Sequence, residues 1–526
     1  MELRLRDLTT EQKIGMLLTG TFSHGQEDID YTIGLIREHK LGSAWVNPFD
    51  ARRDELIRRI REAADYPILI CCDAENGHGD YKIPQAISLA RTGSDPALAY
   101  SFGKVTAVQL HALGYNVITN PVLDMTGNHN CPCGANTRVF GNDKDKVANL
   151  GIAIGRGMHD SGVLVMAKHY PGVGDIGVDT HMQEGRIEET AEELLRYRLY
   201  PYLKMMEAGV LDAAMTAHLL VPKIDPDYPA SLSRKVLSLL REHGFDGFYM
   251  TDALSMMGVV LKYGRYACNG LAAAAGNECV LSWGISNKEA YEALLDAYRR
   301  GVFSDELLDA SVTRLLAAQH KAAVLHDERT CTEITEEDKE NFRRINEDCI
   351  CRIVNRGVSP AVDKNGRHLF VVLTDNDYDP IAQEDAPISE FDWYLPQRIK
   401  EKILATYPNS EVYLLRYFPS ASDSSILFNK QIAFDDVIYV TYWRTSAYLG
   451  RECLSSRVIG VMEALQTTNR IAAVLHFGNP YLMEEIPHVD RLLLGCCSAQ
   501  CINHAFDVLS GDAEARGTEH YKLHLK

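Results

Sequence analysis

The sequence predicts an α/β protein in which a (β/α)8-type barrel precedes a smaller α/β sandwich domain. Between residues 40 and 320, short β-rich runs alternate with longer helical ones. The short runs are apolar on both faces, as expected for parallel strands covered by helices. A second alternation of this kind begins after residue 360. Seven or eight βα units over about 280 residues match a closed barrel better than an open dinucleotide-binding sheet.

The predicted organisation is a TIM-barrel domain over 1–325, a helical linker over 326–360 and an α/β sandwich domain over 361–526. Seven runs are predicted as strands of the first domain: 43–47, 67–73, 115–121, 163–169, 212–218, 247–253 and 278–283. Helical patterns lie between them, for example over 95–114 and 189–209. Five runs are predicted as strands of the second domain: 368–374, 411–416, 436–443, 471–478 and 491–497.

Composition and charge narrow the class of protein. The 526 residues are 46% hydrophobic and 24% charged, with a net charge of -18. An acidic chain is a poor candidate for binding nucleic acid or anionic membranes, because both repel it. The start of the chain has no signal-peptide pattern, and no apolar run reaches the length of a membrane span. Thirteen cysteines scattered through apolar contexts are typical of reduced, buried thiols, so we expect a cytoplasmic protein.

The sequence predicts neither a cofactor nor a metal. No Gly-x-Gly-x-x-Gly follows a predicted strand, and no phosphate-binding loop is present. His129, Cys131 and Cys133 lie together in "NHNCPCG", but their spacing is not a recognised zinc pattern. We interpret this stretch as a turn with incidental thiols.

Polar residues stand where several predicted strands end. Asp73 follows "PILICC", Lys168 and His169 follow "VLVMA", His218 follows "DAAMTA", and Asp252 follows "GFYMT". In a barrel these ends converge on one face, where active sites are built. Each residue also has a structural interpretation. Asp252 could cap the next helix, Lys168 could pair with a carboxylate, and His218 and Asp73 could be hydrogen-bonded core residues.

The loop "AKHYPGVGDIGVDTHMQ", residues 167–183, carries a further pair. Asp179 and His181 lie two residues apart, beyond turns made by one proline and three glycines. A carboxylate so placed can orient an imidazole and stabilise its charged form, which gives a general acid and base near neutral pH. The glycines would let the loop close over the barrel and retract. The alternative is a surface loop with solvated charges.

These motifs resemble glycoside hydrolase family 3. "KHYPGVGD" with "VDTH" resembles the family's Lys-His-aromatic-Pro-Gly loop, and more narrowly its β-N-acetylhexosaminidase branch. "IDPDYPASLSRKVLSLLREHGFDGFYMTDALSMMGV" resembles the nucleophile region, while "ALGYNVITNPVLD" and "TRVFGND" resemble the segment leading to a substrate-binding arginine. The resemblance covers most of residues 5–320 and continues more weakly, through "HFGNPYLME" and "SGDAEARG", into the second domain.

The resemblance implies roles for individual residues. Asp252 would be the catalytic nucleophile, His181 the general acid/base and Asp179 its partner, with anomeric configuration retained through a glycosyl-aspartate intermediate. Lys168 or another cation would keep Asp252 ionised. The residues expected to bind the sugar are Asp73, Arg138, Lys168 and His169, together with His218 from its strand-end position. Asn76 and His78 stand where the branch has glycine and arginine, so the exact sugar and linkage stay open.

Three functions are compatible with these residues. The first is an exo-β-N-acetylglucosaminidase acting on peptidoglycan- or chitin-derived saccharides, with a variant that passes the intermediate to phosphate instead of water. The second is a β-glucosidase or β-xylosidase of the same family. The third is a sugar-binding protein on an inactive barrel. The second domain could serve the aglycone side, form the contact of a homodimer, or stabilise the barrel.

Overall fold

The computed structural model describes residues 3–127, 131, 137–357, 359, 361–374, 396–443, 454–468 and 471–526. The chain forms two compact units, each built from several segments. The first unit contains Met1–Lys82, Pro96–Cys131 and Asn142–Lys339. The second contains Ile83–Asp95, Pro132–Gly141 and Glu340–Lys526.

The first unit is a nearly closed barrel of eight parallel strands, which confirms the predicted fold class. In barrel order the strands are β1 (Leu18–Thr21), β2 (Ser43–Trp45), β3 (Leu69–Asp73), β6 (Val117–Thr119), β7 (Leu164–Tyr170), β9 (Ala213–Thr216), β12 (Phe248–Thr251) and β13 (Val280–Leu281). Strand β13 pairs with β1. A parallel bridge between Met250 and Cys279 joins β13 to β12 and brings the sheet back on itself.

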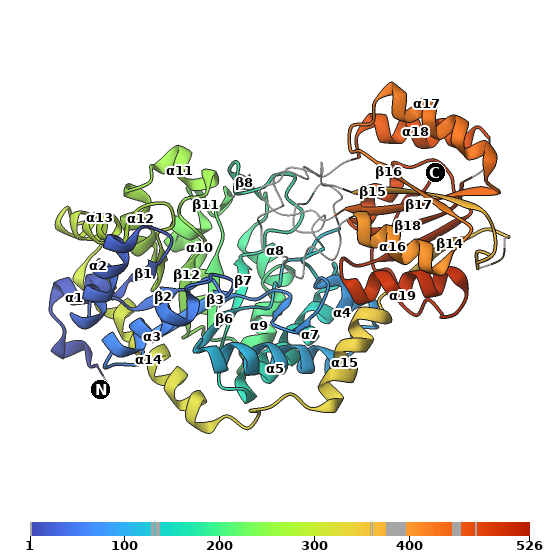
Figure 1. The fold of residues 1–526 in the computed structure, drawn as a ribbon. Coiled ribbons are helices and arrows are strands. Elements are labelled where there is room, and N and C mark those ends of the chain that lie inside the picture. Colours follow the sequence, from blue (N-terminus) through green and yellow to red (C-terminus); the bar gives the residue numbers. More distant parts are fainter. Residues whose placement is uncertain are drawn as a thin grey trace. The chain divides into compact units, whose positions relative to one another are not determined.

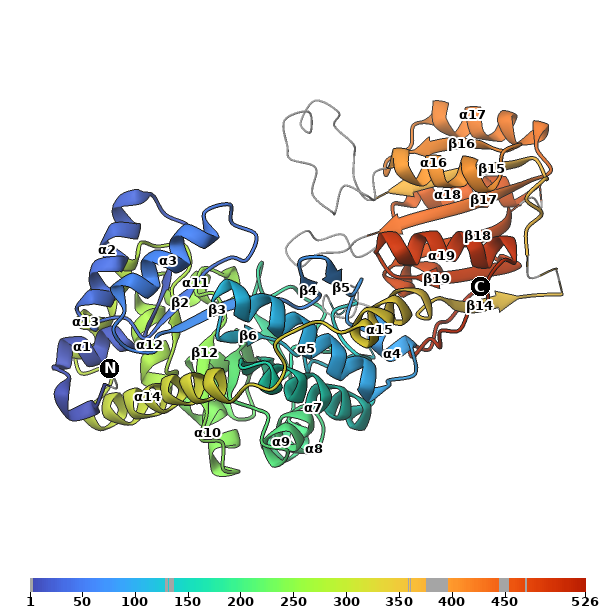
Figure 2. The ribbon, with the colours of Figure 1, turned by 60° about the horizontal axis from the view of Figure 1, so that its bottom comes forward.

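Helices cover the outside of this barrel (Figures 1 and 2). The described helices of this unit are α1 (Thr10–Met16), α2 (Gln26–Arg37), α3 (Arg53–Ala63), α5 (Pro96–Leu113), α7 (Lys144–Asp160), α8 (Ala191–Arg196), α9 (Tyr200–Glu207), α10 (Arg234–Glu242), α11 (Met257–Tyr263), α12 (Ala267–Ala275), α13 (Asn287–Arg299) and α14 (Asp305–Glu328). No helix in the described part of the chain is both long enough and apolar enough to cross a membrane.

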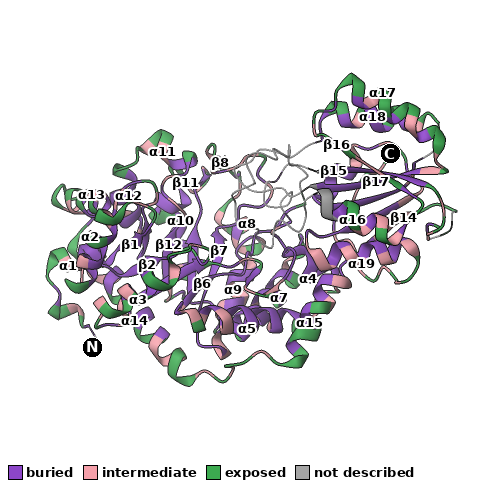
Figure 3. Cartoon of the chain, in the orientation of Figure 1, coloured by how far each residue is buried: buried purple, intermediate pink, exposed green. Residues whose placement is uncertain are grey.

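The barrel strands are buried along nearly their whole length, as Figure 3 shows. Strand β3 illustrates the pattern: four buried residues precede the exposed Asp73. Strand β1 was not predicted, because two of its four residues are threonines and one is glycine, so it does not form an apolar run. Thr19 is nevertheless fully buried, since its hydroxyl bonds that of Ser43 at 2.8 Å. A buried polar residue is tolerated in a strand when a neighbour satisfies its hydrogen bonds. Such a strand is not an apolar run, so the hydrophobic pattern does not reveal it.

Short strands follow the C-terminal ends of the barrel strands. One hairpin comprises β4 (Gly77–His78) and β5 (Tyr81–Lys82). A three-stranded sheet comprises β8 (Gly185–Arg186), β10 (Leu219–Val221) and β11 (Asp225–Pro229). These elements belong to the connections that, in barrels, carry active-site residues.

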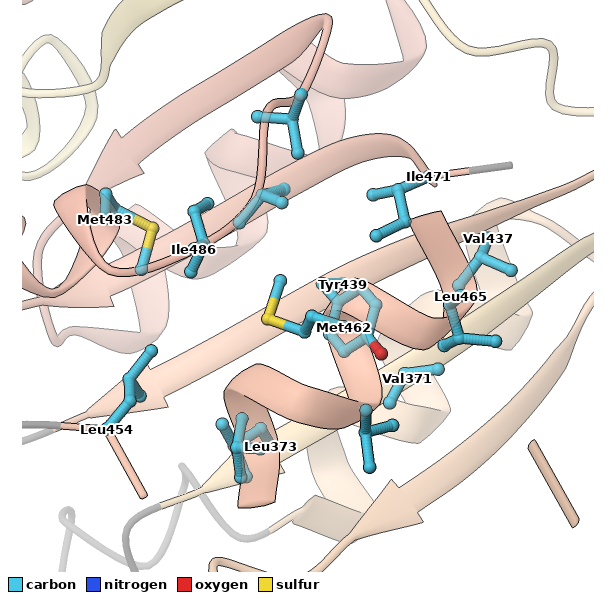
Figure 4. Packing of buried hydrophobic residues seen from close by; sticks show 14 of the residues in the cluster. Val371, Leu373, Val437, Tyr439, Leu454, Met462, Leu465, Ile471, Met483 and Ile486 are labelled. Carbon is cyan, nitrogen blue, oxygen red and sulfur yellow. The ribbon is translucent and has the colours of Figure 1, made fainter. Parts of the chain in front are cut away.

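The second unit is a six-stranded sheet in the order β14-β19-β18-β17-β15-β16. Its strands are β14 (Cys351–Asn355), β15 (His368–Thr374), β16 (Glu411–Leu415), β17 (Asp436–Trp443), β18 (Ile471–Gly478) and β19 (Arg491–Gly495). Its described α-helices are α4 (Ile87–Arg91), α16 (Pro396–Thr406), α17 (Ala421–Lys430), α18 (Ser456–Gln466) and α19 (Ala499–Ser510). Figure 4 shows part of the apolar cluster of this unit, including Tyr439 and Met462.

The segment predicted as a helical linker is helical only in part. Helix α15 spans Glu336–Glu347, but Cys351–Asn355 form strand β14, which pairs antiparallel with β19. The charged residues before it suggested a helix throughout. Cross-strand pairing of a short β-branched stretch outweighs that local preference.

Candidate active site

The predicted polar residues of four strands gather at the C-terminal end of the barrel. Asp73 is the last residue of β3, Lys168 and His169 lie near the end of β7, His218 follows β9, and Asp252 follows β12. All five belong to the first unit. These residues lie together because each stands at the C-terminal end of an apolar strand, and all strands of a parallel barrel end on the same face.

Lys168 forms one polar cluster in this face. Its ammonium lies 2.5 Å from Asp73 Oδ1 and 2.7 Å from Glu75 Oε1. The side chain of Lys168 is 2% exposed, whereas that of Asp73 is 53% exposed. Thr119 also donates its hydroxyl to Asp73. The two carboxylates neutralise the charge of the buried lysine, while the side chain of Asp73 remains exposed to solvent.

His169 forms a second cluster with Asp124, which lies beyond β6. Nδ1 of His169 donates to Asp124 Oδ2 at 2.6 Å. Asp124 is fully buried, and its other oxygen accepts the backbone N–H groups of His169 (3.3 Å) and Val173 (2.7 Å). Burial raises the pKa of Asp124, but the imidazole and these hydrogen bonds outweigh burial and hold the pKa below its ordinary value.

Asp252 sits among histidines. Burial raises its pKa, but His169 first, then His218 and His181, and the N–H of Ala253, outweigh burial and hold the pKa below its ordinary value. The carboxylate is therefore ionised at neutral pH. The sequence predicts Lys168 or another cation in this role, and histidines are the cations that lower the pKa of Asp252.

Asp252 does not cap the helix that follows. Helix α11 begins at Met257, and its N-cap residue Met256 makes no side-chain cap. Asp252 instead accepts the N–H of Ala253 at 2.8 Å, and its own N–H bonds the carbonyl of Thr216 at 2.9 Å. The carboxylate is thus held by the N–H of Ala253 and the backbone of Asp252 by strand β9, and helix capping does not explain the residue.

His218 is buried behind Asp252. It is fully buried, with Nδ1 at 2.8 Å from Ser231 Oγ and Nε2 donating to the carbonyl of Ala253 at 2.9 Å. Burial lowers the pKa of His218, so the ring is mostly neutral at pH 7. Both ring nitrogens contact protein atoms. This geometry matches the alternative of a hydrogen-bonded core histidine better than that of a sugar ligand.

Asp179 and His181 form the couple that the sequence predicts. Nδ1 of His181 donates to Asp179 Oδ1 at 2.7 Å, and the same oxygen accepts the N–H of His181 at 2.9 Å. The side chain of Asp179 is 10% exposed and that of His181 is 36% exposed. Asp179 thereby fixes the ring orientation and leaves the Nε2 edge as the one that can reach a ligand.

The first half of the loop formed by residues 167–183 is tightly packed. A Cβ at Gly174 would lie 1.5 Å from the carbonyl oxygen of Met125, so only glycine fits there. Asp175 accepts the N–H of Gly127 at 2.8 Å. The buried guanidinium of Arg198 donates to the carbonyls of Gly172 and Gly174. These contacts hold the segment that leads to Asp179.

The second half of the loop joins the chain beyond Asp252. The N–H of Met257 donates to the carbonyl of His181 at 3.0 Å, and that of Gly258 donates to the carbonyl of Thr180 at 3.1 Å. A Cβ at Gly258 would lie 2.7 Å from the Thr180 carbonyl oxygen, so this approach requires glycine. The loop that carries Asp179 and His181 therefore packs against the segment that follows Asp252.

Other predicted positions lie elsewhere or outside the described residues. Arg138 belongs to the second unit and is half-buried, and its role as a sugar ligand stays a prediction. His78 is buried on the β4–β5 hairpin, with its ring 5.5 Å from that of Phe49. In "NHNCPCG", Cys131 is buried, but His129 and Cys133 lie outside the described residues. Among described residues no group of three or more His, Cys, Asp or Glu is placed to hold a metal ion.

Sequence reasoning missed three residues that build this site: Glu75, Asp124 and Arg198. Asp124 ends the stretch "NPVLD". It meets the same criterion as the predicted strand-end residues, because it is a polar residue that follows an apolar strand. Glu75 follows Asp73 by two residues and carried no separate signal. Arg198 lies on the chain between α8 and α9, where no local pattern distinguishes it from a surface charge.

An ionised carboxylate and an oriented imidazole at the C-terminal end of a barrel are groups of the kind that enzymes use for nucleophilic and acid–base catalysis. Comparison with known proteins then gives the family. The model of the glycosyl hydrolase family 3 N terminal domain matches residues 9–318. The chain belongs to glycosyl hydrolase family 3, and it is a glycoside hydrolase that acts on carbohydrate.

Individual relatives agree with this. A beta-hexosaminidase of Tolumonas auensis is 32% identical over 250 residues, which cover 46% of this chain and 73% of that protein. A beta-hexosaminidase of Vibrio cholerae is 35% identical over 251 residues, with the same coverage. The solved family 3 beta-N-acetylglucosaminidase of Paenibacillus sp. str. FPU-7 is 28% identical, with a TM-score of 0.81 over 99% of this chain and 100% of that chain.

Proposed function

We propose that this protein is a retaining exo-β-N-acetylglucosaminidase that releases terminal N-acetylglucosamine from peptidoglycan- or chitin-derived saccharides. The observation that carries the proposal is the connection of the two halves of the site. The carbonyl of His181 accepts the N–H of Met257, five residues after Asp252, and His181 is among the groups that lower the pKa of Asp252. The names of the relatives above support the choice of sugar.

The first chemical step uses both groups. Asp252 attacks the anomeric carbon while His181 donates its Nε2 proton to the leaving oxygen, so the glycosidic bond breaks and a glycosyl-aspartate forms. The low pKa of Asp252 keeps this oxygen nucleophilic. Asp179 accepts from Nδ1 throughout and stabilises the ring while it carries charge.

The second step reverses these roles. Neutral His181 removes a proton from water, the water oxygen bonds the anomeric carbon, and Asp252 leaves as a carboxylate. Two inversions at the same carbon retain its configuration. A neutral base also avoids a second anion close to Asp252 when the carboxylate is released.

The residues around the nucleophile would bind the sugar. Asp73 keeps an exposed carboxylate that can accept from sugar hydroxyls, and Lys168 of β7 pairs with it. His169, the next residue of β7, is proposed as a further sugar ligand. Arg138 is proposed as a further ligand from its match to the family motif. His218 is proposed to hold the backbone carbonyl of Ala253 and so to position Asp252, instead of contacting sugar.

The test compares aryl β-N-acetylglucosaminide with aryl β-glucoside as substrates. Dominant turnover of the N-acetylglucosaminide is expected, with the β-anomer as the first product in NMR spectra. Dominant turnover of the glucoside would favour a β-glucosidase or β-xylosidase and reject the proposal. Adding phosphate separates hydrolysis from phosphorolysis, because phosphorolysis yields a sugar 1-phosphate. Turnover of neither substrate would favour a sugar-binding protein.

Location and assembly are part of the proposal. The acidic charge and scattered thiols favour the cytoplasm and argue against nucleic-acid or membrane partners. A homodimer is a candidate assembly. Light scattering of the purified protein would give its mass, and a mass of about 59 kDa, the 58.8 kDa of one chain, would reject the dimer.

A further inference from the structure

We propose that Arg198 is a positioning residue for the reaction: its buried guanidinium ties together the two ends of the segment 175–188, which carries Asp179 and His181. The inference rests on the function proposed above, because it takes His181 to be the proton donor. Arg198 is assigned no contact with the sugar or the reacting carbon; it acts through the segment that it holds.

Where the segment begins, Arg198 bonds the backbone. Its Nη1 group donates to the carbonyl of Gly172 at 3.3 Å and to that of Gly174. Gly172 also packs against the stem of the arginine, since a Cβ at Gly172 would lie 3.1 Å from Cβ of Arg198. The chain is therefore fixed to Arg198 shortly before it reaches Asp179.

Where the segment ends, Arg198 bonds a carboxylate. Its Nε group donates to Glu189 Oε1 at 2.8 Å, and its Nη2 atom lies 2.8 Å from the same oxygen. Glu189 directly precedes the capping box that Thr190 and Glu193 form at the start of helix α8, so its backbone is itself held in place. One guanidinium thus bonds the chain on both sides of the segment.

The burial and shape of the side chain suit this task. The side chain of Arg198 is 5% exposed and that of Glu189 is 27% exposed. A buried guanidinium needs partners for its N–H groups, and here its planar fork divides them between two carbonyls and a carboxylate. Lysine has its donors on a single nitrogen, so it cannot bond both ends of the segment in the same geometry.

The middle of the segment lies against the chain that follows Asp252. The carbonyls of Thr180 and His181 accept the N–H groups of Gly258 and Met257. These bonds place the imidazole only while both ends of the segment stay where they are. If one end is released, the ring of His181 should shift, and a displacement of about 1 Å can cost roughly 10²-fold in rate.

Arg198→Lys should therefore impair proton donation more than nucleophilic attack. A nitrophenolate departs without full protonation, whereas a sugar leaving group needs the proton of His181. We expect kcat/KM to fall by roughly 10²-fold for the N-acetylglucosamine disaccharide of chitin, and by about tenfold or less for nitrophenyl β-N-acetylglucosaminide. A residue that merely stabilises the barrel would lower both values by the same factor, because it changes only the folded fraction.

The matched control is Arg241→Lys. Arg241 has the same set of partners at the N-terminal end of the barrel: it donates to the carbonyls of Phe245 at 3.0 Å and Gly247 at 2.6 Å, and to the carboxylate of Glu278 at 2.9 Å. This variant should lose stability but keep the ratio of the two kcat/KM values found in the unchanged enzyme. Thermal unfolding of each variant confirms that the compared proteins are folded.

A second variant covers the case in which Arg198→Lys does not fold. Glu189→Ala releases only the far end of the segment, at a side chain that is partly exposed. It should show the same selective loss on the disaccharide. Its control is Glu188→Ala, because the neighbouring Glu188 is exposed and pairs with Arg186 at the surface.

Two results separate this inference from the proposed function. Equal losses on both substrates in Arg198→Lys, or in Glu189→Ala where that variant replaces it, would overturn the inference. If the unchanged enzyme cleaves neither substrate, the proposed function fails instead.

Discussion

The two ends of the barrel contain the same kind of residue pair and use it differently. At the C-terminal end, buried Asp124 holds His169 at 2.6 Å. At the N-terminal end, buried Asp212 holds His159, also at 2.6 Å. Both aspartates have a pKa below the ordinary value, because interactions with histidine outweigh burial.

The difference lies in what surrounds each pair. Asp212 also meets the ammonium of Lys321 at 2.5 Å and accepts the N–H of Val165 at 2.7 Å, so its charge is compensated within the pair's own neighbourhood. At the other end, His169 also acts on a second carboxylate, Asp252. A lowered pKa or a carboxylate–histidine pair therefore does not identify a site by itself. Position relative to the strand ends does.

The largest effect should come from Asp252→Ala, which removes the nucleophile. Without the covalent route, kcat should fall by at least about 10³-fold. Steady-state kinetics on aryl β-N-acetylglucosaminide measure the loss, and the unfolding temperature should change little. Turnover that survives the substitution would assign the nucleophile elsewhere and remove the basis of the comparison.

His181→Gln should reduce kcat by about 10²–10⁴-fold, the usual contribution of a proton-transfer group. The loss should be smaller for a nitrophenyl leaving group, which departs without full protonation, than for an alkyl or sugar leaving group. A loss that is equal for both leaving groups would argue against proton donation by His181.

Asp212→Asn should affect stability instead of catalysis. Removing one partner of a buried ion pair costs about 3–5 kcal/mol in the free energy of unfolding, while kcat per folded molecule should stay unchanged. Denaturant unfolding followed by circular dichroism gives the first quantity and active-site-normalised kinetics the second. A specific loss of kcat would mean that the N-terminal end also serves the reaction.

The pH dependence of stability sharpens the same contrast. Because the pKa of Asp212 is lower in the folded protein than the value of about 3.9 expected when unfolded, its contribution is present above that pH and is lost below it. The stability difference between the unchanged protein and Asp212→Asn should therefore shrink as the pH falls below about 4. Unfolding measured at pH 7 and pH 3 tests this; an equal difference at both would contradict it.

The smallest effect should follow Lys321→Gln. Lys321 has a side chain that is 47% exposed, and such ion pairs contribute no more than about 1 kcal/mol. The unfolding temperature should shift by a few degrees at most and activity should be unchanged. A cost comparable to that of Asp212→Asn would show that lysine, not histidine, is the main partner of Asp212.

The fold was predictable because most barrel strands are visible in the sequence as short apolar runs. Seven of the eight barrel strands and five of the six in the second unit lie within or overlap predicted runs. The missed strands are β1, where the hydroxyl of buried Thr19 bonds Ser43 of the neighbouring strand, and β14, whose pairing partner is about 140 residues away. Both depend on long-range contacts, which local pattern does not contain.

The candidate site was predictable to a similar extent. Strand-end position identified Asp73, Lys168 and Asp252, and spacing identified Asp179 with His181. It also grouped His218 with the sugar ligands, although both of its ring nitrogens contact protein atoms. Lys168 or another cation was expected to keep Asp252 ionised, and the choice between them stayed open, because a sequence shows which cations are nearby along the chain and not which carboxylates they neutralise.

The hydrogen bond from Met257 to the carbonyl of His181 has a consequence for engineering. Grafting residues 167–183 alone into another barrel would leave the imidazole without its support, and the graft would need the stretch from Asp252 to Gly258 as well. The transferable module of this enzyme is thus two segments that lie some seventy residues apart in the chain and are exchanged together.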